Sequence, residues 1–238
     1  MIKMVVSSFY NTLIDLEDAI PTSTMLQIER LHKKKILFSV CTNRRFQEIL
    51  EYNKDFPFVD YIISLNGSYI YDVENGKSLF KSKLSTINLK KVTALFEKEK
   101  MTFYGEDKVY KKKEEIGENE IYKIEIEFPI HVEAYEDALK KMKVNYSILE
   151  INNKKYLEIT SSKANMFVGV DKISLKNSIG LKEIMVICAN DSDVPMVKNI
   201  PNSYIMKNSA ESLKRICENV TFSNDNKGVE NVLKKLEK

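Results

Sequence analysis

Polar side chains follow four short apolar runs of this chain. Ser8 and Tyr10 come after the first run, Thr42 after the second, Asn66 after the third and Asp193 after the fourth. If the runs are parallel strands, their carboxyl ends meet at one edge of a sheet, where ligands of open α/β sheets bind. We therefore expect these side chains to border one crevice.

The chemistry open to the first two residues is limited. A serine hydroxyl is neutral at pH 7 and needs an adjacent base before it can act as a nucleophile. The two histidines are His32, near the end of a predicted helix, and His131, in a later region. Neither is an obvious partner for Ser8. Tyr10, with an ordinary pKa of about 10, either donates a hydrogen bond to a phosphate or fills the site with its ring.

The apolar runs have the character of buried parallel strands. Strand and helix alternate at a spacing that predicts a parallel sheet with helices on its faces. We expect residues 20–23 to stop the preceding turn and cap the first helix, and Thr42 or Asn43 to cap the second. Strands are predicted at 4–8, 36–41, 61–64, 184–188 and 203–206, with a hairpin of 69–71 and 78–80. Helices are predicted at 25–35, 163–178, 210–217 and 228–236, and the helix capped at Thr42 or Asn43 carries Phe46, Ile49 and Leu50.

The pattern changes between residues 83 and 161. Residues 121–128 alternate between apolar and polar side chains, which indicates a strand with one wet face. Helices are expected at 89–99 and 132–142, and strands at 102–104, 146–151 and 156–160, the last two joined at Asn152-Asn153. We predict an α/β core of residues 1–82 and 162–238, and an inserted α+β cap domain of residues 83–161.

Composition excludes several classes of function. A net charge of +3 from 37 basic and 34 acidic residues is too balanced to predict nucleic-acid binding. No apolar run approaches the roughly 20 residues of a membrane helix, and no signal peptide is recognisable. The three cysteines, Cys41, Cys188 and Cys217, are an odd number without metal-type spacing, which disfavours disulfides and zinc. We expect a cytoplasmic protein, and its oligomeric state stays open.

The order of these fragments resembles the haloacid dehalogenase (HAD) superfamily, and within it the Cof-type sugar-phosphate phosphatases. The resemblance implies a Rossmannoid HAD-like core with a cap domain, hinged near residues 81–83 and 161–163. It covers nearly the whole chain, and the fragments that carry it are Thr12-Leu13-Ile14-Asp15, Thr42-Asn43-Arg44, Asn66-Gly67 with Tyr69-Ile70-Tyr71-Asp72, Asp193-Val194-Pro195-Met196, Asn208-Ser209-Ala210, and Val220 to Asn224 with Gly228-Val229.

The resemblance also implies roles for single residues. In that family an Asp ending the first strand is the nucleophile and an Asp two residues later is the general acid and base. Carried over by position, these become Ser8 and Tyr10. The Gly-Asp pair after the fourth strand becomes Cys188-Ala189, and the Asn-Asp pair that helps to bind magnesium becomes Ser192-Asp193. Thr42 keeps its place, so the resemblance implies a retained scaffold whose catalytic carboxylates are largely replaced.

Several assignments stay open within the resemblance. Asn190-Asp191 is an alternative register for the Asn-Asp pair, although neither register restores an Asp at Ala189. A family lysine that opens a later helix is either Lys163 or Lys172, and we prefer Lys163 because the first turn of a helix can point into the crevice. With Asp193 as the main anionic ligand, a magnesium site would be vestigial and weak. Magnesium is expected only if activity is retained.

Three functions are compatible with these residues. The leading hypothesis is a pseudophosphatase that binds a phosphorylated small molecule between core and cap through Thr42, Asn66 and a lysine. The second is an active phosphate monoester hydrolase with an atypical site or with Cys41 or Cys188 as nucleophile. The third is a protein-interaction role that uses the edge of the cap sheet or aromatic residues of the cap, such as Tyr104, Tyr110 and Tyr122.

Overall fold

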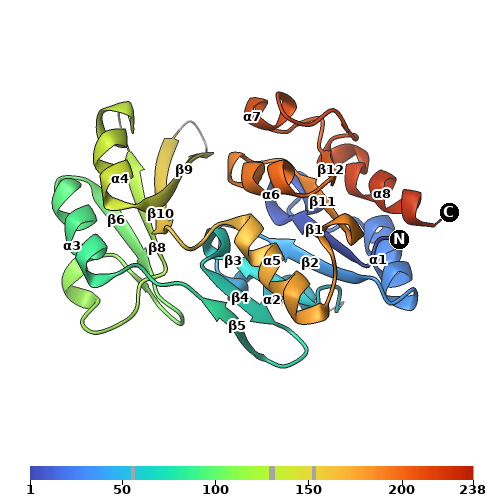
Figure 1. Ribbon diagram of the computed structural model, residues 1–238, viewed down its shortest axis with the longest axis horizontal. Coiled ribbons are helices and arrows are strands. Elements are labelled where there is room, and N and C mark those ends of the chain that lie inside the picture. The colour runs from blue at the N-terminus through green and yellow to red at the C-terminus, as the bar shows by residue number, and fades with distance from the viewer. Residues whose placement is uncertain (55–56, 129–131, 152–153, 238) are drawn as a thin grey trace.

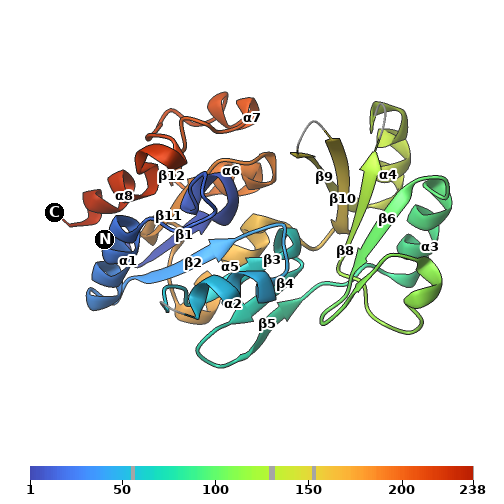
Figure 2. The same ribbon diagram turned by 180° about the vertical axis from the view of Figure 1, so that it is seen from behind.

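The structure is a computed structural model that describes residues 1–54, 57–128, 132–151 and 154–237. It has two parts, each built on one sheet (Figure 1). The core is a seven-stranded sheet with its helices, and the cap is a five-stranded sheet with two helices. The two parts lie side by side and are joined by two segments of chain (Figures 1 and 2).

The core sheet has the order β12-β11-β1-β2-β3-β4-β5. The strands from β12 to β3 run parallel to one another. Strand β4 is antiparallel to β3, and β5 is antiparallel to β4. The carboxyl end of β1 is therefore flanked by those of β11 and β2, as the sequence predicts. The strands are β1 Met4–Ser8, β2 Leu37–Cys41, β3 Tyr61–Ser64, β4 Tyr69–Asp72, β5 Lys77–Lys81, β11 Ile184–Cys188 and β12 Asn202–Ile205.

Helices cover both faces of the core sheet because its central strands are apolar on both sides. In β1, Val5 packs into a hydrophobic cluster with α1, α2 and α8, whereas Met4 and Val6 pack into another with α5, α6 and α7. Each such side chain contributes roughly 1.5–3 kcal/mol when it is fully buried. The predicted α/β fold class is confirmed. The helices are α1 Thr22–Lys33, α2 Phe46–Asn53, α5 Met166–Asn177, α6 Val194–Asn199, α7 Glu211–Lys214 and α8 Gly228–Leu233.

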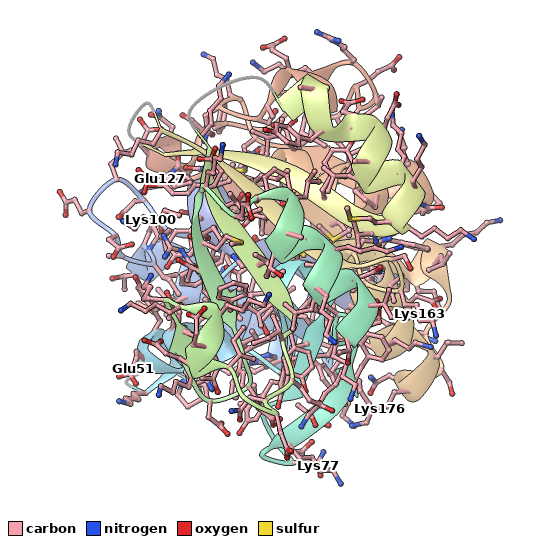
Figure 3. The ribbon with its side chains drawn as sticks, turned by 90° about the vertical axis from the view of Figure 1, so that its left-hand side faces the viewer. Glu51, Lys77, Lys100, Glu127, Lys163 and Lys176 are labelled. Atoms are coloured by element: carbon pink, nitrogen blue, oxygen red, sulfur yellow. The ribbon has the colours of Figure 1, made fainter. Side chains whose placement is uncertain are left out.

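The cap sheet is antiparallel, with the order β7-β6-β8-β10-β9. Helices α3 and α4 pack on the face that carries Ile124 and Ile126 of β8. The opposite face carries polar residues, and Figure 3 shows Lys100 and Glu127 close together at its rim, 3.5 Å apart. The elements are α3 Thr86–Leu95, β6 Lys100–Tyr104, β7 Val109–Tyr110, β8 Lys123–Phe128, α4 Glu136–Met142, β9 Val144–Ile151 and β10 Lys154–Ser161.

The polar face of the cap sheet is only partly exposed to solvent, whereas the sequence predicts a fully solvated face. Lys123 and Glu158 are 0% and 2% exposed, because this part of the face packs against the core. The chain crosses between the two sheets after β5 and after β10, near the positions where hinges are predicted. In the part of the chain that the structure describes, none of the helices is long and apolar enough to cross a membrane.

The first helix of the core begins without the predicted side-chain cap. Helix α1 starts at Thr22 directly after Pro21, and no side chain bonds its first N–H groups. The hydroxyl of Ser23 instead donates to Glu230 of α8. Ser23 therefore connects two helices on the same face of the sheet.

The second helix begins later than a cap at Thr42 or Asn43 would require. Helix α2 starts at Phe46, and the Glu48 carboxylate accepts the backbone N–H of Arg45 at 3.3 Å. The residues between β2 and α2 are therefore free to form a loop at the end of the sheet.

The helix predicted at 163–178 begins three residues late. Asn165 caps α5 by accepting the N–H of Val168, so Met166 is its first residue. The helix predicted at 210–217 is shorter, with α7 ending at Lys214. The turn predicted at Asn152-Asn153, like His131, lies outside the described residues.

Candidate binding crevice

A cavity of about 400 Å³ lies between core and cap at the carboxyl ends of β1, β2 and β11. Loops that leave these strands form its floor, and β9 and β10 of the cap form its roof. Of the predicted site residues, Tyr10, Thr42 and Asp193 line it, together with Arg44 and Glu158. The predicted crevice is therefore present, with walls from both parts of the molecule.

The chain turns sharply where it leaves β1. Residues Phe9–Leu13 form one wide helical turn, in which Tyr10 is extended and Asn11 has a φ of 60°. Asn is one of the few residue types that tolerate this left-handed conformation. The Asn11 side chain donates to Asn190 Oδ1 at 2.9 Å, and its carbonyl accepts from Asn208 Nδ2 at 3.0 Å. These bonds tie the turn to the loops that follow β11 and β12.

Ser8 lies beneath the floor of the crevice and is hydrogen-bonded to Asp193, which is part of the lining. Ser8 Oγ donates to Asp193 Oδ2 at 2.6 Å. The same oxygen accepts the backbone N–H groups of Ala189 at 3.0 Å and Asn190 at 2.9 Å. Both side chains are only 1% exposed. Three neutral donors therefore satisfy one buried carboxylate oxygen.

Burial shifts the pKa values of the ionisable groups around this pair. Burial raises the pKa of Asp193 above its ordinary value, and the hydrogen bonds from Ser8 and the backbone oppose this only in part. Cys41 Sγ lies 3.4 Å from Ser8 Oγ. Burial also raises the pKa of the Cys41 and Cys188 thiols well above the ordinary value. Since the thiolate is the nucleophilic form, neither cysteine is activated.

Arg44 is the single cationic side chain among the described residues that line the cavity. Its guanidinium carbon lies 5.6 Å from the centroid of the Tyr10 ring. Burial raises the pKa of Tyr10, although the charge of Arg44 acts to lower it, so the phenol stays protonated at neutral pH. The ring packs edge-on against Phe9 and forms part of the wall. Tyr10 therefore leaves the cavity open and does not fill it.

A second buried carboxylate, Glu158, joins the cap to the core. It accepts hydrogen bonds from Lys123 Nζ at 2.7 Å, Asn43 Nδ2 at 3.0 Å and Asn66 Nδ2 at 2.8 Å. Lys123 Nζ also donates to the Asn43 carbonyl at 2.9 Å. Asn66 thus faces Glu158 and is not among the residues that line the cavity. This set of side chains fixes the roof of the crevice to one edge of its floor.

The charges of this cap–core cluster stabilise each other. Burial acts to lower the pKa of Lys123, but Glu158 and Glu125 outweigh it and the pKa is raised. Burial acts to raise the pKa of Glu158, but Lys123 outweighs it and the pKa is lowered. Both groups are therefore charged at neutral pH. The negative charge of Glu158 is balanced before any ligand enters the crevice.

A family model described as haloacid dehalogenase-like hydrolase matches residues 11–141 and 107–233. The chain belongs to the haloacid dehalogenase-like hydrolases. The matched part begins after Ser8 and Tyr10. A comparison with curated proteins finds no match.

Solved structures share the haloacid dehalogenase-like fold over the whole chain. A haloacid dehalogenase-like hydrolase from B. subtilis has a TM-score of 0.88 at 16% identity, with 99% of this chain and 100% of that one covered. A phosphatase of the superfamily from Bacteroides thetaiotaomicron has a TM-score of 0.86 at 18% identity, with 100% and 96% covered. A subclass IIB sugar phosphatase has a TM-score of 0.82 at 21% identity, with 99% of both covered. The resemblance to the haloacid dehalogenase superfamily is confirmed by the family model, and these structures share its fold.

Magnesium is the ion that the resemblance to haloacid dehalogenase-like hydrolases implies beside Asp193, and the residues here fit it poorly. Mg²⁺ prefers a near-octahedral shell of hard oxygens that includes carboxylates. Asp193 Oδ2 already accepts three hydrogen bonds, and the nearby Tyr10 carbonyl accepts Asn190 Nδ2 at 3.1 Å. Asp191 is exposed and bonded to a serine hydroxyl. Within the described ranges, no three His, Cys, Asp or Glu side chains are grouped to hold a metal.

The two candidate lysines do not line the cavity of this haloacid dehalogenase-like chain. Lys163 is exposed, and Figure 3 shows it well away from Lys100 and Glu127. Lys172 Nζ lies 5.7 Å from the centroid of the Phe80 ring. At the start of α5 it is the apolar Met166 that reaches the wall.

Sequence reasoning missed three residues of the site. Arg44 appears only within the fragment Thr42-Asn43-Arg44, although an arginine in the loop after a strand of a parallel sheet can bind an anion there. Lys123 and Glu158 occupy polar positions of alternating strands, and such positions are usually solvated. No local signal separates them from their exposed neighbours.

The side chains proposed for alternative functions are mostly buried. Tyr104, Tyr110 and Tyr122 are 7%, 5% and 1% exposed, so they do not form the aromatic docking surface that the sequence suggests. His32 Nε2 lies 3.2 Å from Asp60 Oδ2, and neither residue is among those that line the crevice.

Proposed function

We propose that this chain is a catalytically degenerate haloacid dehalogenase-like phosphatase that binds a phosphorylated small molecule between core and cap. The observation that carries the proposal is the buried hydrogen bond from Ser8 to Asp193. A phosphoryl transfer of this type needs an ionised nucleophile, a neutralising cation and a proton donor for the leaving oxygen. The crevice supplies none of these in the usual form.

The position of Ser8 argues against its acting as a replacement nucleophile. Its hydroxyl lies beneath the floor, is not among the groups that line the cavity, and directs its hydrogen to Asp193. Tyr10 offers no base, because burial keeps its phenol protonated. The nucleophile and acid/base positions therefore hold side chains that stabilise the loop and leave the phosphorus without an attacking group.

The wall of the crevice still favours an anion. Arg44 forms no ion pair with any other described residue, and the Tyr10 ring lies against its guanidinium. Thr42 Oγ1 accepts the backbone N–H of Arg44 at 3.0 Å, which leaves its own hydroxyl hydrogen free to donate. A guanidinium fork with adjacent hydroxyl donors suits a phosphate group. In this proposal Arg44 supplies the positive charge for the phosphate group that the resemblance implies for a lysine.

Turnover of phosphate esters tests the catalytic half of the proposal. The substrates are p-nitrophenyl phosphate and a panel of sugar phosphates, chosen because one similar structure is a sugar phosphatase. With magnesium present we expect no turnover above the buffer rate. Turnover that Ser8→Ala reduces would show an active hydrolase and overturn the proposal.

Ligand-induced stabilisation tests the binding half. Sugar phosphates from the same panel should raise the melting temperature of the wild type, since a ligand that binds only the folded state stabilises it. Arg44→Gln should lose most of this rise, whereas the exposed Lys163→Gln serves as the matched control and should keep it. Equal loss in both variants, or no rise in the wild type, would contradict specific binding at Arg44.

A further inference from the structure

The floor of the crevice is held together by the chain's own hydrogen-bond donors. Asn190 uses both ends of its side chain, because Nδ2 donates to the Tyr10 carbonyl at 3.1 Å and Oδ1 accepts from Asn11 at 2.9 Å. Ser8 donates to Asp193 at 2.6 Å. Two of the oxygens that a hard cation would seek, Asp193 Oδ2 and the Tyr10 carbonyl, thus accept hydrogen bonds from a hydroxyl and an amide.

We propose that the crevice binds its anionic ligand without a divalent cation, with Ser8 and Asn190 holding the floor and Arg44 supplying the positive charge. This inference rests on the proposed function and defines how the same site recognises its ligand. It departs from the magnesium dependence that the resemblance implies. The ligand class is a phosphate group free of bound metal.

The cost of admitting a cation supports this inference. Mg²⁺ at Asp193 Oδ2 would displace the hydrogen of Ser8, and Mg²⁺ at the Tyr10 carbonyl would displace the Asn190 amide. Leaving a buried donor without a partner costs roughly 1–3 kcal/mol. Near-octahedral coordination would then offer one carboxylate and neutral oxygens as the protein's share, which makes a weak site.

The charges of the residues around the crevice also support anion binding without a divalent cation. Glu158 of the roof forms an ion pair with Lys123 at 2.7 Å, which weakens its repulsion of an anionic ligand. Asp193 is almost fully buried in the floor, and its Oδ2 accepts hydrogen bonds from three donors. Asp191 is an acidic residue at the exposed rim of the crevice. It has no lysine or arginine partner in the described chain and is bonded to a serine hydroxyl. Arg44 is left to pair with the ligand.

Calorimetry and thermal shift with inorganic phosphate test the inference. Titrations are run in EDTA and in excess magnesium on the wild type. We expect dissociation constants that agree within about twofold between the two buffers, and no heat or thermal shift from magnesium alone. A phosphate affinity at least about tenfold higher with magnesium would overturn the inference. Stabilisation of the wild type by magnesium alone would do the same.

A variant makes the role of Ser8 falsifiable. Ser8→Asp places a second carboxylate beside Asp193, so it should lose stability in EDTA and regain it when magnesium is added. Ser8→Asn, similar in size and neutral, should show no magnesium response. If Ser8→Asp also fails to respond, Ser8 is not what excludes the cation, and that part of the proposal is wrong.

The outcomes separate this inference from the proposed function. Phosphate binding that requires magnesium overturns only the inference. Turnover of phosphate esters overturns only the non-catalytic reading. If phosphate, like the sugar phosphates, stabilises the wild type in neither buffer, binding itself is absent and both proposals fail.

Discussion

Glu158 and Asp193 are two carboxylates buried to almost the same extent, 2% and 1% exposed, and they are stabilised in different ways. Glu158 has a lysine partner at 2.7 Å, and its pKa is lowered. Asp193 has three neutral donors, and its pKa is raised. Hydrogen bonds alone therefore do not offset the loss of hydration of a buried charge here, whereas an added cation does.

This difference separates the cap–core cluster from the floor of the crevice. In the cap–core cluster the positive charge of Lys123 is part of the chain, so the cluster is complete without a ligand. At the end of β1 the chain provides only dipoles, with Ser8 and the backbone as donors. The comparison predicts that the two carboxylates respond in opposite ways to mutation and to pH.

The largest effect is expected from Lys123→Met. This change leaves Glu158 charged, buried and without a cation, and breaking a buried pair from one side costs roughly 3–5 kcal/mol of unfolding free energy. Urea unfolding followed by circular dichroism measures the loss. Combining it with Glu158→Gln should restore much of it, since no unpaired charge remains. Lys154→Met, which breaks an exposed pair with Glu127 on the same sheet, is the matched control and should have little effect.

A smaller loss is expected from Ser8→Ala, because Asp193 keeps its two backbone donors. Removing one donor from a buried acceptor costs roughly 1–3 kcal/mol. Ser39→Ala is the matched control, since the Ser39 hydroxyl is fully buried and has no hydrogen-bond partner among the described residues. It should be neutral or stabilising. Equal losses in both variants would mean that packing of the hydroxyl, and not its bond to Asp193, sets the cost.

The pH dependence of stability should have opposite signs at the two carboxylates. The folded pKa of Asp193 is raised, so the folded state holds this proton to higher pH than the unfolded state does. Stability is therefore lost as pH rises from about 4, the unfolded pKa, through the folded value. Asp193→Asn should remove this downward slope.

Glu158 gives the opposite slope because its folded pKa is lowered. Its contribution is fully present above the unfolded pKa of about 4.3 and is lost as pH falls through the folded value. Glu158→Gln should flatten the profile on the acidic side. Chemical unfolding of both variants and the wild type across pH 3 to 7, roughly the range in which carboxyl groups titrate, measures the two slopes. Slopes of the same sign would contradict the comparison.

The fold was predictable because its strands carry a strong signal. The apolar runs at 4–8 and 184–188 coincide with β1 and β11, and the change to alternating residues after 83 marks the cap sheet. These patterns depend on which residues are buried away from water, and the apolar residue types show this directly in the sequence. Helix starts were less predictable, since the loop after β2 uses Thr42 to bond a backbone N–H and delays α2 to Phe46.

The site was predictable only where it depends on strand order. Tyr10, Thr42 and Asp193 meet because they follow parallel neighbours in one sheet. The burial of Lys123 and Glu158 was not predicted, because it arises from contact between the cap and the core, whose segments are far apart in the sequence. A polar residue in an alternating strand looks the same whether water or a second domain covers it.

The smallest effect is expected at the lysine that the sequence favours for phosphate binding. Lys163 is exposed and does not line the crevice, so Lys163→Ala should change unfolding free energy by no more than about 0.5 kcal/mol. Its affinity for inorganic phosphate in EDTA should equal that of the wild type, whereas Arg44→Gln should weaken it by about tenfold or more, the loss of one charge-assisted contact. Isothermal titration of both variants decides between them. If Lys163→Ala weakens phosphate binding as much as Arg44→Gln does, the segment between β10 and α5 must bring Lys163 to the ligand in solution, and Arg44 is not the single cation that binds it.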